Sequence, residues 1–188
     1  MNDEEYATAT SQKSKLSAQA AQNQAVWYAT YNDKLMETDP ELAEIFGNFA
    51  FGDVQQYGKL STRNRILVTM ASAIATNSVT EYRKTLYAAF SNGITPMEIK
   101  EVLYHAVPYA GMSRIEDLLE IANSFFTEKG IELPLASQSV VTSETRMEKG
   151  LALQKSIFGN QIDKMYETSP ANQLHIQQYL SANCFGDY

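Results

Sequence analysis

The hydrophobic positions of the chain recur at helical spacing over most of its length. The clearest case lies between Pro96 and Gly111, where a helix is apolar at positions i, i+3, i+4 and i+7, namely Ile99, Val102, Leu103 and Ala106. A second row of mostly polar side chains lies beside this face at the same spacing: Glu98, Glu101, His105 and Tyr109. We expect this row to line the rim of a pocket. No segment alternates between apolar and polar residues over a sustained run. The pattern therefore predicts an all-α fold.

The ends of this helix carry the residue types that begin and end helices. Gly93 ends the preceding helix, and Thr95 with Glu98 forms a capping box around Pro96 at the first helical position. Gly111 ends the helix, because glycine adopts the left-handed conformation that a helix terminus often requires.

Similar signals predict further helices along the chain. Asp39 and Pro40 mark a helix start, and we expect that helix to break near Gly52. Ser113 and Glu116 form another capping box. The expected helices cover residues 11–36, 40–52, 61–74, 79–91, 96–111 and 113–130.

Two short motifs occur twice, in the same order. Residues 36–40 are echoed by residues 166–170, and Phe-Gly-Asp occurs at 51–53 and again at 185–187. Chance produces short repeats, but two in one order favour a duplicated unit whose second copy is incomplete. The second copy holds four additional residues between its motifs, about one helical turn. We expect an N-terminal helical extension (1–36), a first unit (37–133), a linker (134–142) and an incomplete second unit (143–188).

Composition narrows the classes of function. The formal net charge is −7 and no dense run of Lys or Arg occurs, so we expect neither nucleic acid nor a membrane as a partner. The first residues are acidic and polar, unlike a signal peptide, which predicts a cytoplasmic protein. Cys184 is the single cysteine, and His105 and His175 are the only histidines. We therefore expect no disulfide within the chain and no metal site.

Residues 92–111 resemble the signature of the carboxymuconolactone decarboxylase family. They read Asn-Gly-Ile-Thr-Pro-Met-Glu-Ile-Lys-Glu-Val-Leu-Tyr-His-Ala-Val-Pro-Tyr-Ala-Gly. The resemblance extends from about residue 51 to about residue 131 and includes Phe51-Gly52-Asp53-Val54 and the segment 60–67. It implies a helical bundle of the carboxymuconolactone decarboxylase and alkylhydroperoxidase D-like type, assembled as a trimer or hexamer.

The resemblance also implies a chemistry. Decarboxylases of this family remove CO2 from a small carboxylated lactone in the catabolism of aromatic compounds, without a cofactor. Matched to the family pattern, Arg65 would hold a substrate carboxylate, His105 would donate a proton, and Glu81 would orient a partner or take part in proton transfer. The residues expected to contact the substrate are Thr85, Glu101 and Tyr109. The expected partners are a small carboxylate or lactone and further copies of the chain.

Departures from the family pattern leave other functions open. Thr85 stands where the decarboxylases have a histidine, and a hydroxyl is no acid near neutral pH, so a related enzyme with another substrate or a non-catalytic oligomeric binding module is an alternative. The peroxidase branch of the superfamily uses a Cys-x-x-Cys pair where this chain has Ser78 and Glu81. Peroxidase activity is therefore not expected. Arg65 in an ion pair and His105 at a plain helix surface are the structural alternatives.

Overall fold

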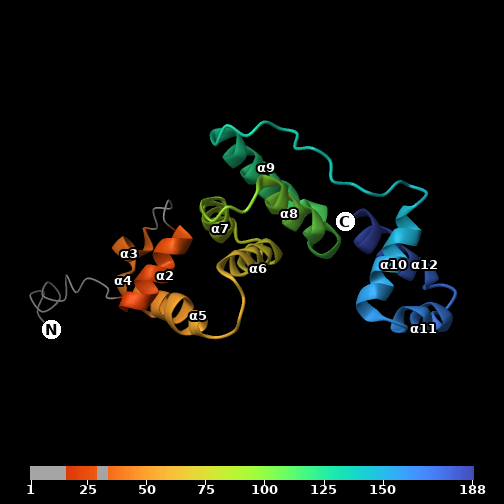
Figure 1. The fold of residues 1–188 in the computed structure, drawn as a ribbon, viewed down its shortest axis with the longest axis horizontal. Coiled ribbons are helices and arrows are strands. Elements are labelled where there is room, and N and C mark those ends of the chain that lie inside the picture. Colours follow the sequence, from red (N-terminus) through yellow and green to blue (C-terminus); the bar gives the residue numbers. More distant parts are fainter. Residues whose placement is uncertain (1–15, 29–33) are drawn as a thin grey trace, which may run out of the picture. The chain divides into compact units, whose positions relative to one another are not determined.

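A computed structural model describes residues 16–28 and 34–188, and these residues contain helices and no strand (Figure 1). The predicted all-α fold is confirmed. The elements are α2 (Ala18–Tyr28), α3 (Leu35–Thr38), α4 (Pro40–Gly47), the π-helix η1 (Asn48–Asp53), α5 (Val54–Gln56), α6 (Thr62–Ala75), α7 (Val79–Ser91), α8 (Pro96–Ala110), α9 (Met112–Glu128), α10 (Arg146–Phe158), α11 (Gln161–Thr168), α12 (Leu174–Tyr179) and the π-helix η2 (Leu180–Asp187). Within the described ranges, no helix has the length and apolar character needed to cross a membrane.

The chain divides into two compact units. Of the described residues, unit 1 comprises 16–28, 34–70 and 80–95, and unit 2 comprises 71–79 and 96–188. This division assigns α8 to unit 2 and nearly all of α7 to unit 1. The boundaries expected at 37–133 and 143–188 stay a prediction.

In unit 1, α2 packs on η1 through an aromatic cluster. The rings of Trp27 and Phe51 meet edge to face with centroids 5.9 Å apart, and those of Tyr28 and Phe51 do so at 5.5 Å. Edge-to-face contacts stabilise aromatic pairs beyond the burial of their surface. Trp27 and Phe51 are 5% and 4% exposed, so this cluster forms one part of the core of unit 1.

Two helix boundaries in unit 1 differ from the prediction. Leu16 and Ser17 are not helical, and α2 begins at Ala18, because the Ser17 hydroxyl accepts a hydrogen bond (3.1 Å) from the Ala20 amide as an N-cap. Residues 11–15 and 29–33 of the predicted helix 11–36 lie outside the described residues. The predicted break near Gly52 is wrong, because the backbone continues through Gly52 as η1 and α5. A Cβ at this position would lie 3.6 Å from the Cβ of Ala20, an ordinary contact, so the segment packs on α2 without requiring glycine.

A row of apolar side chains on α4 and η1 faces outward. Its members are spaced i, i+3, i+4 and i+7, and each is more than half exposed: Leu42, Ile45, Phe46 and Phe49. We call this row the α4 stripe. Contiguous exposed apolar surface usually marks an interaction site. The predicted self-association stays a prediction.

In unit 2, α8 packs against α9 as its periodicity predicts. Ile99 and Leu103 of α8 are fully buried, as are Ile115 and Leu118 of α9. Gly111 has a φ of 86° and stands between the two helices, which confirms it as a helix end. The capping box predicted at Ser113 is wrong, because α9 already begins at Met112.

The two copies of the duplicated motifs have the same local structure. Each Phe-Gly-Asp ends a π-helix, η1 or η2. In the second copy, Phe158 and Phe185 meet edge to face with centroids 6.0 Å apart, as Tyr28 and Phe51 do in the first. The α4 helix begins at Pro40, whereas α12 begins at Leu174, four residues after the equivalent Pro170, so the additional length lies in a turn before α12. The duplication stays a prediction, with which these local features agree.

Candidate active site

The predicted carboxylate anchor, Arg65, is engaged with the backbone. Its guanidinium donates hydrogen bonds to the carbonyl oxygens of Tyr57 (2.6 Å), Leu60 (3.1 Å) and Val54 (3.5 Å). These bonds tie the segment between α5 and α6 to the start of α6. Arginine has five N–H donors in a planar fork, so three carbonyl partners use much of its capacity.

Glu81, near the start of α7, lines a small pocket within unit 1. The Tyr28 hydroxyl donates a hydrogen bond to Glu81 Oε1 (3.2 Å), and Lys84 lies on the same wall one helical turn along. The other lining residues are mostly apolar and come from α2, α3, α4 and η1: Gln24, Leu35, Met36, Ala43, Phe46 and Phe51. A carboxylate and an ammonium in mostly apolar surroundings can orient a charged ligand and exchange a proton with it.

This pocket is small. Its volume is about 30 Å³, room for one or two water molecules. A small organic acid therefore enters only if lining side chains move. Met36 and Phe46 are 36% and 54% exposed, so they have space to turn outward.

Thr85, the residue that departs from the decarboxylase pattern, is fully buried on α7. Its hydroxyl donates to the carbonyl oxygens of Tyr82 (2.9 Å) and Glu81 (3.0 Å) in its own helix. The neighbouring Tyr82 hydroxyl is buried with no hydrogen-bond partner among the described residues, and burial raises its pKa. The Thr85 proton is thus already used within the helix.

The other predicted residues lie on α8 in unit 2. His105 is exposed, and its ring centroid lies 5.9 Å from that of Tyr109, which is 65% exposed. Glu101 is also exposed. These three side chains form one row on α8, but His105 and Tyr109 are exposed on the helix surface rather than at the rim of a pocket, as we had expected. Convergence of Arg65, Glu81 and His105 in one pocket stays a prediction.

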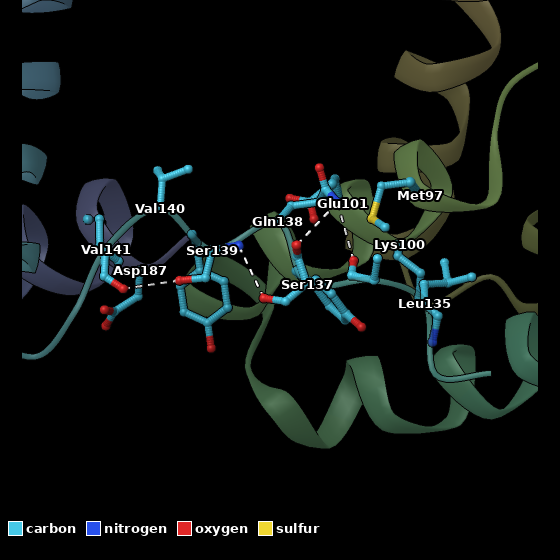
Figure 2. Close-up of a pocket in the computed structure, with 14 residues that line it drawn as sticks. Met97, Lys100, Glu101, Leu135, Ser137, Gln138, Ser139, Val140, Val141 and Asp187 are labelled. Carbon is cyan, nitrogen blue, oxygen red and sulfur yellow. Dashed lines mark hydrogen bonds between the residues drawn. The ribbon is translucent and has the colours of Figure 1, made fainter.

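Glu101 borders a larger cavity of about 490 Å³ within unit 2. Figure 2 shows Met97 and Glu101 of α8 on one side of it and the linker residues from Ser137 to Val141 along another. Its volume is in the range of small-molecule sites. Neither His105 nor Tyr109 borders this cavity.

Lys100 also borders this cavity and is only 7% exposed. Its Nζ donates a hydrogen bond to Asn123 Oδ1 (2.5 Å) and lies 5.9 Å from the ring centroid of Tyr104. Burial lowers the pKa of Lys100, because desolvation disfavours the ammonium. The sequence pattern did not single out this residue.

The single cysteine and the possible metal ligands are the remaining candidates for chemistry among the described residues. Cys184 lies in η2 and is 7% exposed, and burial raises the pKa of its thiol, which disfavours the reactive thiolate. No group of three or more His, Cys, Asp or Glu side chains in the same ranges could hold a metal ion.

Comparison with known proteins identifies the family. The family model described as the carboxymuconolactone decarboxylase family matches residues 40–124. A 4-carboxymuconolactone decarboxylase from Acinetobacter baylyi is 31% identical over 99 residues, which cover 53% of this chain and 74% of that relative. The chain belongs to the carboxymuconolactone decarboxylase family. No solved structure matches it.

Only some of the residues that line the Glu81 pocket lie in the segment that matches the family. Glu81 and Lys84 lie inside residues 40–124, together with Phe46 and Phe51. The pocket residues of α2 and α3 precede the matched range. Sequence reasoning missed Lys84, although its spacing of three residues from Glu81 on one helix is a usable signal. It also missed Tyr28, which lies 53 residues from Glu81 in the chain.

Proposed function

We propose that this member of the carboxymuconolactone decarboxylase family is a carboxy-lyase. It would remove CO2 from a small carboxylated lactone formed in the breakdown of aromatic compounds. The observation that carries the proposal is that Glu81 and Lys84 both line a mostly apolar pocket, inside the segment that matches the family. The likeness to a 4-carboxymuconolactone decarboxylase adds support.

The reaction needs a cation, an apolar environment and a proton donor. The bond between the carboxylate carbon and the ring breaks, CO2 leaves, and the electron pair passes to the lactone framework, which then takes up one proton at carbon. Apolar walls favour this step because the charge of the carboxylate becomes dispersed as CO2 forms.

We assign the roles as follows. Lys84 would hold a substrate carboxylate, since it carries an ammonium and lines the same pocket as Glu81. Glu81 would carry or relay the proton. His105 remains the candidate proton donor from the family pattern, and its exposed position on α8 leaves it open to solvent.

The test is the release of CO2 from 4-carboxymuconolactone by the purified chain. Glu81→Gln should lower kcat by roughly a hundredfold or more, and Lys84→Met should mainly raise KM. Lys59→Met, at an exposed position away from the pocket, is the matched control and should leave both constants unchanged. Wild-type turnover that survives Glu81→Gln would refute the assigned role of Glu81.

A related enzyme with a different substrate is the second candidate, and Thr85 favours it. Because this buried hydroxyl donates to carbonyls of its own helix, it does not supply the acid that a histidine would. Thr85→His should raise turnover of 4-carboxymuconolactone if this departure limits the reaction. A wild-type chain that is inactive on this lactone, with no gain in Thr85→His, would favour the different substrate.

A further inference from the structure

We infer that α2 completes the Glu81 site and that Tyr28 is a positioning residue for the Glu81 carboxylate. The inference rests on the proposed function, because Glu81 is the group that we place in the reaction. Tyr28 precedes the segment that matches the family, so the match alone does not point to it.

The Tyr28 side chain is held in place by ring contacts and points its hydroxyl at Glu81. Its hydroxyl donates to Glu81 Oε1 at 3.2 Å. Its ring packs edge to face on Phe51 (5.5 Å between centroids, 81° between planes) and lies 6.4 Å from the ring of Trp27. A side chain held by two aromatic neighbours loses little further freedom when it forms a hydrogen bond, so the bond orients the carboxylate efficiently.

The second copy of the duplicated unit serves as an internal comparison. Phe158 takes the place of Tyr28 there and keeps the edge-to-face contact with Phe185, at 6.0 Å and 88°. Packing of the pair therefore does not require a hydroxyl. The hydroxyl occurs in the copy in which a glutamate accepts its hydrogen bond.

The same comparison accounts for the pocket itself. Tyr166 occupies the position of Met36, and its hydroxyl lies 2.7 Å from that of Ser181, which donates to Gln154 Oε1 at 2.5 Å. These buried polar groups satisfy one another in the second copy. In the first copy, Met36 and Gln24 stand at the positions of Tyr166 and Gln154, and both line the Glu81 pocket. The positions that are filled by hydrogen-bonded polar groups in the second copy therefore line a pocket in the first copy, which also carries Tyr28 and Glu81.

The test is a double-mutant cycle with Tyr28→Phe, Glu81→Gln and the double variant. Tyr57→Phe is the matched control, because the Tyr57 side chain is 78% exposed. For each protein, kcat and KM for CO2 release from 4-carboxymuconolactone and the midpoint of urea unfolding are measured. The fold should tolerate Tyr28→Phe, since the second copy already has phenylalanine at this position.

We expect Tyr28→Phe to lower kcat roughly tenfold and to change KM less than about twofold, because a hydrogen bond to a charged group is lost while the pocket wall remains. The double variant should be no slower than Glu81→Gln alone. Losses that multiply in the double variant, or a Tyr28→Phe enzyme that matches Tyr57→Phe, would overturn the inference.

A wild-type chain with no activity on the lactone would count against the proposed function. The contact between Tyr28 and Glu81 would then be tested by the unfolding data alone. If the two substitutions together shift the urea midpoint by less than the sum of their separate shifts, the contact between Tyr28 and Glu81 is supported. Additive shifts would overturn it.

Discussion

Gly150 on α10 offers a sharp test of how the second copy is packed. A Cβ added at this position would lie 1.9 Å from the carbonyl oxygen of Ser181 and 2.7 Å from the amide nitrogen of Gly186, both backbone atoms of η2. Backbone cannot rotate away as a side chain can. Gly150→Ala must therefore push α10 and η2 apart by about 1 Å, since Cβ contacts under 3.0 Å essentially never occur.

The expected cost follows from this contact. Overpacking a tight interface costs about 1–3 kcal/mol, and a clash with backbone belongs at the upper end of that range. The better helix propensity of alanine offsets about 0.5–1 kcal/mol of this loss of stability. A net loss of about 2 kcal/mol remains, which lowers the melting temperature by about 4–8 °C for a chain of this length.

Gly52→Ala is the matched control in the first copy. Its added Cβ would meet the Cβ of Ala20 at 3.6 Å and the Ser17 hydroxyl at 3.8 Å, which are ordinary contacts. We expect this variant to melt at or slightly above the wild-type temperature.

Two measurements check the pair of variants. Circular dichroism follows the melting of each protein, and a thiol reagent reports on η2 through Cys184, which is 7% exposed in the wild type. Gly150→Ala should speed the reaction of Cys184, and Gly52→Ala should leave it unchanged. Wild-type melting and thiol reactivity in Gly150→Ala, or an equal loss in both variants, would refute the reasoning.

Three further predictions concern other parts of the chain. Burial lowers the pKa of Lys100, so the unfolded chain keeps this proton to higher pH than the folded chain does. The contribution of Lys100 to the free energy of unfolding therefore rises with pH up to about 10.5. Lys100→Met should flatten this rise in urea titrations across alkaline pH. Thiol-dependent consumption of hydroperoxides should be absent, and activity that disappears in Cys184→Ser would contradict this. Light scattering should find a trimer or hexamer, and Ile45→Glu in the α4 stripe should dissociate it; a monomeric wild type would rule out the assembly.

The sequence predicted helices best where apolar periodicity and a terminal glycine agree. The α8 helix is an example, because Ile99 and Leu103 are buried and Gly111 has a positive φ. Errors arose where a residue has more than one use. Gly52 looked like a helix end, but it lies within a continuous helical segment that packs on α2, a neighbour distant in sequence.

The candidate site was predictable only in part, for a similar reason. Glu81 came from the family pattern, and the structure places it in the wall of a small pocket. Its contact with Tyr28 joins residues 53 positions apart, which no helical spacing reveals. The backbone bonds of Arg65 were also beyond a sequence pattern, because they depend on the path of the segment between α5 and α6.

The turn at 170–173 shows where this architecture accepts additional length. The second copy places its four additional residues before α12, and the helix that follows keeps its contact between Phe185 and Phe158. By the same logic, the junction between Asp39 and Pro40 is a suitable place to graft a short peptide into the first copy. Four residues inserted within α4 would instead rotate Phe51 by about 40° relative to α2, since each α-helical residue turns the chain by about 100°.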